Sequence, residues 1–303
     1  MTLEQLRIFV AVAEHEHMTR AAHHLNLTQS ATSAAIAALE NRYVTKLFDR
    51  VGRRIALTEA GRLFLVEAKA VLTRAATAET VLADLAGLSR GTVRIAASQT
   101  VGNYWLPPII RRFRSIHGGV TLKLSLGNTE TVAAAVREGL AELGFIEGDI
   151  DDPVLAVRSI ARDQMVLVAP NGHPWSQTPP KAADDLRTAQ WVCRERGSGT
   201  RAALEAVLPA LGLGQEAMES ALELPSNEAV CAAVEAGAGV TILSSHVVRR
   251  ALEAGSLVAI DIKLPSRSFF VLRHKERYVT KASAEFQRLA IEKPIHNTAD
   301  PRR

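Results

Sequence analysis

The stretch TRAAHHLNLTQSATSAAIAALE, residues 19–40, decides the fold of the N-terminal part of the chain. Thr19 is a residue type that caps helices, and it precedes a short Ala-rich segment. A tight turn around Asn26 follows, and Thr28 provides a second N-cap before a longer helical segment. Two short helices joined by such a turn predict a helix-turn-helix.

The second of these helices is the expected DNA-reading element. In helix-turn-helix proteins the first residues of the second helix enter the major groove, where Gln can pair with adenine through two hydrogen bonds. Ile36 and Leu39 recur at helical spacing and predict its inward side. Alanines occupy much of the remaining surface, so few side chains are left to read bases. The expected contacts are Thr28, Gln29, Ser30, Thr32, Ser33 and Ala34, the last against a thymine methyl group.

A basic cluster lies shortly after this motif. The segment VGRR, residues 51–54, has a turn glycine, and Arg50 precedes it. An isolated Arg pair is usually a solvated surface loop. After a helix-turn-helix, the same cluster predicts a short wing whose arginines contact phosphates or a narrow minor groove: Arg50, Arg53 and Arg54.

A long helix is predicted from about Thr58 to Leu85. Its apolar positions recur at intervals of four and three, which is the pattern of a heptad seam. An amphipathic helix packed on its own domain is the alternative, but small residues at the centre favour close packing between two copies. The predicted dimer residues are Phe64, Ala68, Val71, Ala75, Ala78 and Leu82.

Length and composition are those of a soluble, globular protein with two or three domains. The 303 residues are 47% hydrophobic and 22% charged, with a net charge of +4. No apolar run approaches the length that spans a membrane, and Glu4, Arg7 and Glu14 interrupt any signal peptide. We therefore predict a cytoplasmic protein without membrane contacts.

Strand-like apolar runs alternate with helical segments after the short hinge GLSRG, residues 87–91. This alternation predicts an α/β fold. The expected strands cover residues 92–98, 120–127, 141–148, 163–170, 190–195, 239–244 and 267–274, and the helices between them include 129–139, 199–212 and 227–237.

Four blocks in a specific order carry a resemblance to a known family. They are LEQLRIFVAVAE (3–14), TQSATSAAIAALE (28–40), KLFDR (46–50) and LTEAG (57–61). With them the chain resembles the LysR family of bacterial transcription regulators over nearly its whole length. It departs from the family pattern at Val44 and Thr45, where relatives usually have Gly then Val, and in the alanines of the second helix.

The resemblance implies an N-terminal all-α winged helix-turn-helix with a long linker helix, followed by an α/β effector domain. This domain has the two-lobed fold of periplasmic solute-binding proteins. The implied boundaries are 1–58 for DNA binding, 59–90 for the linker and hinge, and 91–303 for the effector domain. The chain would cross between lobes near Ala161 and Ser266, so that lobe I is 91–161 with 267–295 and lobe II is 162–266.

A ligand site is predicted where helices start in this effector domain. Small polar residues stand at four strand-to-helix junctions, two in each lobe, and backbone N–H groups at helix starts attract anions. N-capping alone explains any one junction, but convergence of all four on one cleft favours a small anionic effector. The predicted contacts are Ser98, Gln99, Thr100, Asn128, Thr129, Ser198, Gly199, Thr200 and Asn227.

Catalytic and metal motifs have little support in the sequence. There is no nucleophile elbow, and the GSG at residues 197–199 lacks the Lys of a P-loop. Four histidines (His15, His17, His23 and His24) resemble a metal cluster in composition, yet the first two stand two residues apart and do not share a helix face. We expect neither enzymatic activity nor a metal or other cofactor.

The sequence thus predicts an effector-sensing regulator that binds double-stranded DNA at a dyad-symmetric operator as a homodimer, or as a tetramer built from two dimers. A second hypothesis is a redox switch at Cys193 and Cys231, similar in principle to the peroxide-sensing members of the same family. We interpret both cysteines as small core residues. A solute-binding protein or enzyme on the same two-lobed fold is a third reading, which the helix-turn-helix disfavours.

Overall fold

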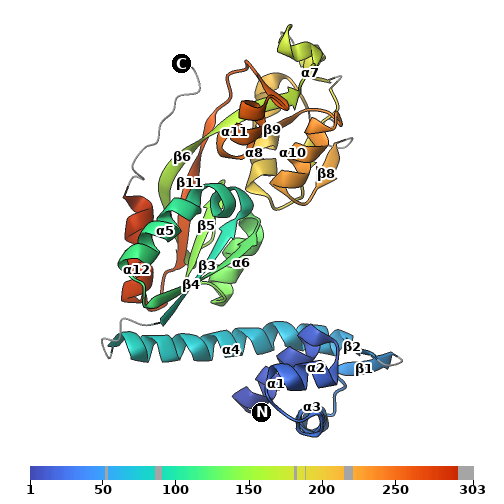
Figure 1. Cartoon of the computed structure of the whole chain (residues 1–303), viewed down its shortest axis with the longest axis vertical. Coiled ribbons are helices and arrows are strands. Elements are labelled where there is room, and N and C mark those ends of the chain that lie inside the picture. The colour runs from blue at the N-terminus through green and yellow to red at the C-terminus, as the bar shows by residue number, and fades with distance from the viewer. Residues whose placement is uncertain (52–53, 86–90, 181–182, 188, 215–220, 293–303) are drawn as a thin grey trace. The chain divides into compact units, whose positions relative to one another are not determined.

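The computed structural model of the chain describes residues 1–51, 54–85, 91–180, 183–187, 189–214 and 221–292 (Figure 1). The chain forms two compact units, Met1–Leu82 and Ala83–Arg303, and the boundary falls within the long helix. Most of the predicted hinge, residues 87–90, lies outside the described residues. None of the described helices combines the length and the apolar character that crossing a membrane requires.

The first unit is a three-helix arrangement with a two-stranded antiparallel hairpin and a long helix. Its elements are α1 (Leu3–His15), α2 (Met18–His24), α3 (Gln29–Tyr43), β1 (Phe48–Val51), β2 (Arg54–Leu57) and α4 (Glu59–Leu85).

Two of the helix starts in this unit were predictable from local sequence, and one was not. The Thr28 side chain accepts a hydrogen bond from the backbone N–H of Ala31 at 3.2 Å, so its predicted role as the N-cap of α3 is confirmed. Thr2 and Gln5 form a reciprocal capping box at α1. The predicted cap at Thr19 is wrong, because α2 already begins one residue earlier.

Two non-glycine residues with left-handed backbone mark the ends of α2 and α3. Asn26, in the predicted turn, has a φ of 56°, which Asn tolerates well. Val44 ends α3 with a φ of 49° and is 93% exposed. A β-branched residue pays about 1–2 kcal/mol for this conformation, which explains why glycine suits the position better.

The core of the first unit also holds part of the predicted dimer seam. Phe9 packs its ring against Phe48 and against Phe64 of α4, with ring centroids 5.3 and 4.8 Å apart. Ala68 is only 1% exposed in the same core, so its prediction as a dimer contact is wrong. The first turns of α4 therefore pack on their own domain, as the alternative prediction for this helix has it. Farther along, Val71 is 42% exposed.

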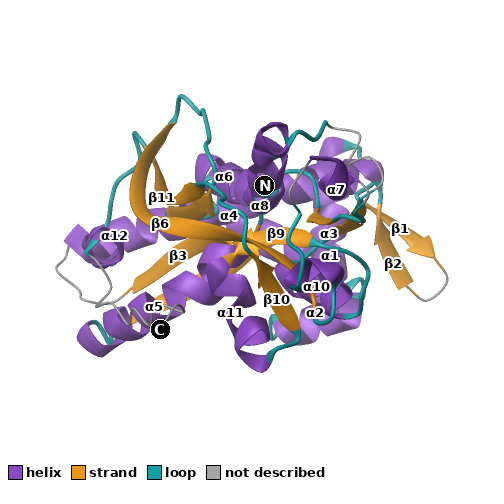
Figure 2. Cartoon of the chain, turned by 90° about the horizontal axis from the view of Figure 1, so that it is seen from above, coloured by secondary structure: helices purple, strands orange, loops and turns teal. Residues whose placement is uncertain are grey.

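The second unit consists of two lobes that share one long strand. Lobe I has β3 (Gly91–Ser98) and β4 (Val120–Gly127) in parallel, β5 (Leu143–Glu147) beside β3, and β11 (Ser266–His274) antiparallel to β5. The curved strand β6 (Leu155–Pro170) pairs with β11 as far as Gln164, with β9 (Thr241–Ser244) from Met165 on and with β10 (Leu257–Ile260) from Leu167 on (Figure 2). The first change of lobe thus lies a few residues after Ala161, and β11 begins at Ser266.

The remaining elements of this unit follow the same alternation of strands and helices. In lobe I they are β3 (Gly91–Ser98), a π-helical turn (Val101–Trp105), α5 (Leu106–Ile116), β4 (Val120–Gly127), α6 (Thr129–Glu138), β5 (Leu143–Glu147), β11 (Ser266–His274) and α12 (Lys281–Ile291). The strand β6 (Leu155–Pro170) leads to lobe II, with α7 (Ala183–Arg187), β7 (Val192–Arg194), α8 (Gly199–Val207), β8 (Leu222–Leu224), α10 (Asn227–Glu235), β9 (Thr241–Ser244), α11 (Ser245–Ala254) and β10 (Leu257–Ile260); single 3-10 turns cover Pro174–Ser176 and Pro209–Leu211.

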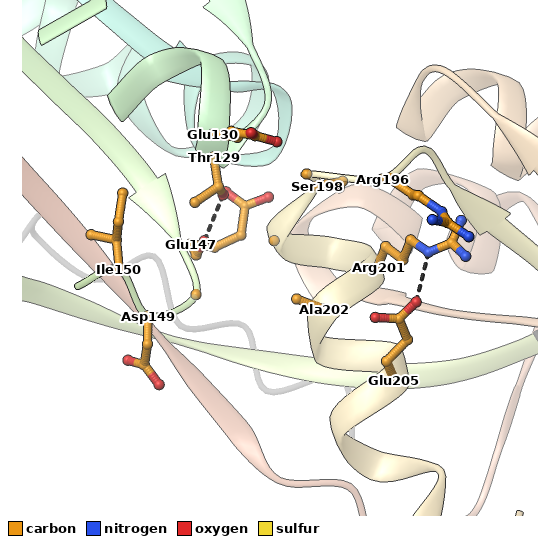
Figure 3. Close-up of a pocket in the computed structure, with 13 residues that line it drawn as sticks. Thr129, Glu130, Glu147, Asp149, Ile150, Arg196, Ser198, Arg201, Ala202 and Glu205 are labelled. Atoms are coloured by element: carbon orange, nitrogen blue, oxygen red, sulfur yellow. Dashed lines mark hydrogen bonds and ion pairs between the residues drawn. The ribbon is translucent and has the colours of Figure 1, made fainter. Parts of the chain in front are cut away.

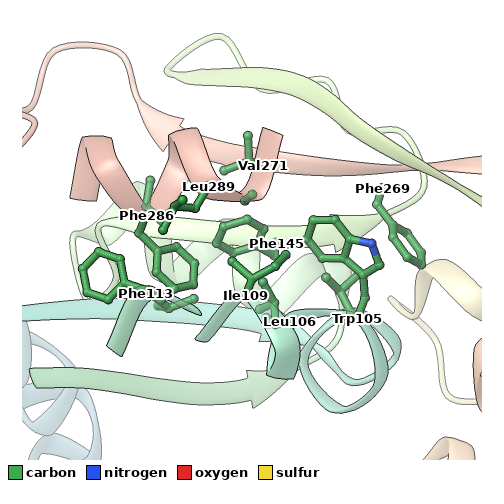
Figure 4. Packing of buried hydrophobic residues seen from close by; sticks show 14 of the residues in the cluster. Trp105, Leu106, Ile109, Phe113, Phe145, Phe269, Val271, Phe286 and Leu289 are labelled. Carbon is green, nitrogen blue, oxygen red and sulfur yellow. The ribbon is translucent and has the colours of Figure 1, made fainter. Parts of the chain in front are cut away.

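Helices cover both faces of the lobe I sheet, which explains its continuous apolar strands. Ile95 and Ala97 face α5 and α12, whereas Ala96 between them packs with α6. On the first face Phe113, Phe145 and Phe286 make edge contacts, with centroids 5.3 and 5.8 Å apart (Figure 4). The sheet is therefore held rigidly, and so are the strand ends that carry the polar residues.

Lobe II has the same two-faced construction. One cluster packs α8 against Leu167 and Trp191, and the other packs α10 and α11 against Val168 and Leu243. The predicted helix at 199–212 is interrupted after Val207, and a short 3-10 turn begins at Pro209. The prediction did not include the first half of β6 or the short strands β8 and β10.

Candidate functional site

The exposed start of α3 presents most of the side chains predicted to contact DNA. Gln29 is exposed and donates through Nε2 to Ser33 Oγ at 2.9 Å, and the hydroxyls of Thr28 and Ser30 lie 3.0 Å apart. The prediction of Thr32 is wrong: this residue is fully buried, and its hydroxyl donates to the Thr28 carbonyl. Ala34 is exposed, as a contact with a thymine methyl group would require.

The hairpin that follows α3 occupies the position of the predicted wing. β1 and β2 pair from Phe48–Leu57 to Val51–Arg54. Arg50 lies in β1 and Arg54 in β2, while Gly52 and Arg53 lie outside the described residues. A backbone hydrogen bond from Ile55 N–H to the Glu16 carbonyl ties the hairpin to the end of α1.

The second unit brings most of the predicted effector residues to one place between the lobes. In lobe I the carboxyl ends of the parallel strands β3 and β5 meet, which places Ser98 beside Glu147. Across from them stands the start of α8, and the Thr200 hydroxyl lies 3.4 Å from that of Thr100. All four side chains are almost completely buried.

The centre of this cluster is a carboxylate that the sequence analysis did not include. Glu147 ends β5 and is 1% exposed. It accepts hydrogen bonds from the hydroxyls of Ser98 and Thr200, the latter at 3.3 Å. Arg267 Nη1 lies 3.9 Å from Glu147 Oε1 and donates to Thr200 Oγ1 at 3.3 Å. We call Ser98, Thr200 and Arg267 the hydroxyl cradle, since together they hold a buried carboxylate.

Arg267 also connects the cradle to the strands that cross between the lobes. Its Nε donates to Asp163 Oδ2 at 2.8 Å, and Ser244 donates to the other oxygen of Asp163 at 2.7 Å. The Asp163 side chain is fully buried and that of Arg267 is 9% exposed. Arg267 Nη2 is buried and has no hydrogen-bond partner among the described residues. One guanidinium group thus forms ion pairs with two buried carboxylates.

A chain of hydrogen bonds supports the cradle from lobe II. The buried Arg194 donates through Nη1 to Asn227 Oδ1 at 2.7 Å, and Asn227 Nδ2 donates to Thr100 Oγ1 at 3.0 Å. The Thr200 hydroxyl uses its hydrogen to donate to Glu147. In the contact between the two threonines, Thr100 is therefore the donor and Thr200 Oγ1 the acceptor. The side-chain amide of Asn227 therefore positions Thr100, and Arg194 positions the amide.

Capping explains some of the predicted site residues but not all of them. Asn128 accepts from the N–H of Thr131 and caps α6, while Ser198 accepts from the N–H of Thr200 and caps α8. Asn128 also donates to Glu195 in the other lobe at 3.2 Å. Thr100 makes no cap hydrogen bond with its side chain, so capping does not account for it.

The two lobes touch closely along this line. Gln99 bridges them by donating to the Pro225 carbonyl and accepting from the N–H of Asn227, both at 3.1 Å. At Gly199 a Cβ atom would lie 2.2 Å from the Glu147 carbonyl oxygen and 2.7 Å from Thr129 Oγ1. Gly199 is therefore required for this approach of α8 to lobe I.

A cavity of about 620 Å³ adjoins the cradle between the lobes (Figure 3). Thr129, Glu130, Glu147 and Asp149 line it from lobe I. The lobe II side has Ser198, Gly199, Arg196, Arg201 and Glu205. Three predicted effector residues thus face an open space, while Ser98, Thr100, Thr200 and Asn227 form the buried contact beside it.

Within the described parts of the chain, the cysteines and histidines do not form a second site of this kind. Arg201 Nη1 lies 3.7 Å from Cys193 Sγ, yet burial still raises the pKa of this thiol. Burial raises the pKa of Cys231 to about 12. Because the thiolate is the reactive form, these environments disfavour a redox switch. The rings of His15 and His24 lie 5.1 Å apart, and no group of three or more metal-ligating side chains occurs among the described residues.

Comparison with known protein families covers nearly the whole chain. Residues 3–62 match the helix-turn-helix model of bacterial regulators of the lysR family, and residues 86–294 match the LysR substrate-binding domain.

Individual relatives agree with these matches. The chain is 35% identical over 288 residues to the uncharacterised HTH-type transcriptional regulator YeiE of Escherichia coli K12, with 94% of this chain and 96% of that protein covered. It is 31% identical over 293 residues to the RuBisCO operon transcriptional regulator of Allochromatium vinosum, with 96% of both covered. The crystal structure of CbnR, a LysR family transcriptional regulator, has the same fold, with a TM-score of 0.71 at 22% identity over 96% of this chain and 98% of that one.

Proposed function

The chain belongs to the LysR family of DNA-binding transcriptional regulators, and we propose that its effector carries an anionic group which the hydroxyl cradle binds in place of Glu147. A ligand at this position lies between the lobes. It changes the free energy of lobe closure and, through this bistable element, operator binding.

The observation that supports an anionic group is the carboxylate already held there. Glu147 is a carboxylate of this chain that sits among two hydroxyl donors and one guanidinium group. Hydrogen bonds to a charged acceptor are stronger than neutral ones, so donors arranged for one carboxylate suit another. The unpaired Nη2 of Arg267 provides a further donor for an incoming oxyanion.

Replacing Glu147 with Gln tests this competition. Glu147→Gln keeps the size of the side chain and removes its charge. A neutral amide competes less strongly for the cradle, and a displaced carboxylate that stays about 4 Å from the ligand would repel it by about 4 kcal/mol at an effective dielectric of 20. Sulfate and succinate should therefore bind the variant at least about tenfold more tightly than the parent. Isothermal titration calorimetry on the full-length protein measures both affinities.

Two further variants make this result specific. Thr200→Val in the Glu147→Gln background removes a cradle hydroxyl and should reverse most of the gain. Glu253→Gln removes an exposed carboxylate of α11 and should leave both affinities unchanged. If neither anion binds the Glu147→Gln variant more tightly than the parent, the cradle is not an effector site.

On the DNA side we propose that Gln29, Ser30 and Ser33 read bases while the wing arginines Arg50, Arg53 and Arg54 contact the backbone. Gln29 and Ser30 are exposed at the start of α3, and the hydrogen bond from Gln29 to Ser33 holds the amide over that turn. A dyad-symmetric operator bound by a homodimer fits this arrangement.

Gln29→Ala should weaken binding to the operator by about 1–3 kcal/mol for each half-site, because a bidentate contact with one base pair is lost there. Affinity for a scrambled duplex of the same length should stay nearly constant, since that binding depends on phosphate contacts. Fluorescence anisotropy on both duplexes at one salt concentration makes the comparison. Equal losses on the two duplexes would contradict base reading by Gln29.

A further inference from the structure

The buried charges around the cradle do not balance. Asp163 and Glu147 are both almost completely buried, and Arg267 is the one cation that forms ion pairs with them among the described residues. A purely anionic ligand would add a further negative charge to this group. If the ligand instead displaces Glu147, the displaced carboxylate moves toward the adjoining cavity, which Glu147 already lines.

The lobe I wall of that cavity is itself acidic. Glu130 and Asp149 are exposed, line the cavity, and have no ion-pair partner in the described parts of the chain. Glu130 lies next to the lobe II loop, since its backbone N–H donates to the Gly197 carbonyl at 3.3 Å. Asp149 follows Glu147 by two residues and lines the same cavity, and Figure 3 shows Glu130 and Asp149 on either side of Glu147.

The opposite wall does not neutralise these carboxylates. Arg201 forms ion pairs with Glu205 at 2.7 Å and with Glu223, so its charge is already matched. Arg196 is exposed and has no ion-pair partner among the residues that the structure describes. Two unpaired carboxylates on one wall and one unpaired guanidinium group on the other leave an excess of negative charge.

From this distribution we infer that the effector is a zwitterion of amino-acid type. Its anionic group occupies the hydroxyl cradle, and its ammonium group lies in the adjoining cavity, whose lobe I wall carries Glu130 and Asp149. This assignment rests on the proposed function, which places an anionic group in the cradle, and adds an ammonium group to the same ligand. The volume of about 620 Å³ leaves far more room than an inorganic oxyanion fills and lies in the usual range for organic ligands.

Matched ligand pairs test the ammonium group separately from the carboxylate. Alanine and propionate, and likewise aspartate and succinate, differ only by an ammonium group. Calorimetry on the full-length protein should give affinities at least about tenfold higher for each amino acid than for its acid, as expected for a close charge pair at a desolvated site. Putrescine, a cation without an anionic group, should not bind.

The double variant Glu130→Gln, Asp149→Asn should abolish the advantage of the amino acids and leave the acids unchanged or slightly tighter. Glu253→Gln on α11 serves as the control for loss of one surface charge and should keep the advantage.

The outcomes separate this inference from the function on which it rests. If each acid binds as tightly as its amino acid, the inference of a zwitterionic effector is wrong, but the proposed anion site is not contradicted. Binding of putrescine alone overturns both. Absence of binding by all four acids and amino acids, in the parent and in Glu147→Gln, overturns both as well.

Discussion

Val71→Glu should convert the protein to monomers and abolish tight operator binding. Val71 is 42% exposed on α4, and Leu82, at another position of the same heptad seam, is 68% exposed. In a dimer through this seam, two glutamates would be desolvated close to each other without a cation. An uncompensated buried charge costs about 3–5 kcal/mol, which raises the dimer dissociation constant by a factor on the order of 100 or more. Sedimentation velocity should show the change in mass.

The control for this variant adds the same charge on the other side of the helix. Thr73 lies two residues on, away from the seam positions, so Thr73→Glu should leave both mass and operator affinity close to the parent values. Ala68 is a poor position for the test, because it is buried in the core of its own unit and a charge there would unfold that unit. An unchanged mass for Val71→Glu would mean that the exposed seam is not the dimer contact.

The helix-turn-helix could be predicted because its signals are local. The cap at Thr28 and the turn at Asn26 depend on residues a few positions apart, and both have the expected conformation. The hydroxyl of Thr32 predicts a base contact, but Ile36 and Leu39 follow Thr32 at helical spacing. The three positions share one helix face, so periodicity rather than residue type determines the burial of Thr32.

The hydroxyls of the candidate site were also predictable, whereas the charges between them were not. Ser98, Thr100 and Thr200 stand at strand ends and helix starts, and such positions converge in α/β folds. Glu147 and Arg267 meet only because β5 pairs with β11, and β11 with β6, in one register. Register between distant strands cannot be read from one sequence. A charged residue at the end of the apolar run AELGFIEG was the one available signal.

Arg267→Met should destabilise the second unit more than any other single substitution at the site. The change keeps an unbranched apolar stem that reaches about as far as Nε of the arginine, and it removes the cation that Asp163 and Glu147 share. Breaking a buried ion pair by removing one partner typically costs about 3–5 kcal/mol, because the remaining charge stays buried without compensation. Urea unfolding followed by tryptophan fluorescence reports on this unit, since Trp105, Trp175 and Trp191 all lie within it.

Two comparisons decide whether the loss comes from the buried carboxylates. Arg288→Met makes the same substitution in an exposed ion pair with Glu285 on α12 and should change the urea midpoint little. Adding Glu147→Gln and Asp163→Asn to Arg267→Met removes both uncompensated charges and should restore a large part of the lost stability. If the triple variant is no more stable than Arg267→Met alone, the arginine stabilises the fold through packing of its side chain, and the charge imbalance inferred for the cradle does not exist.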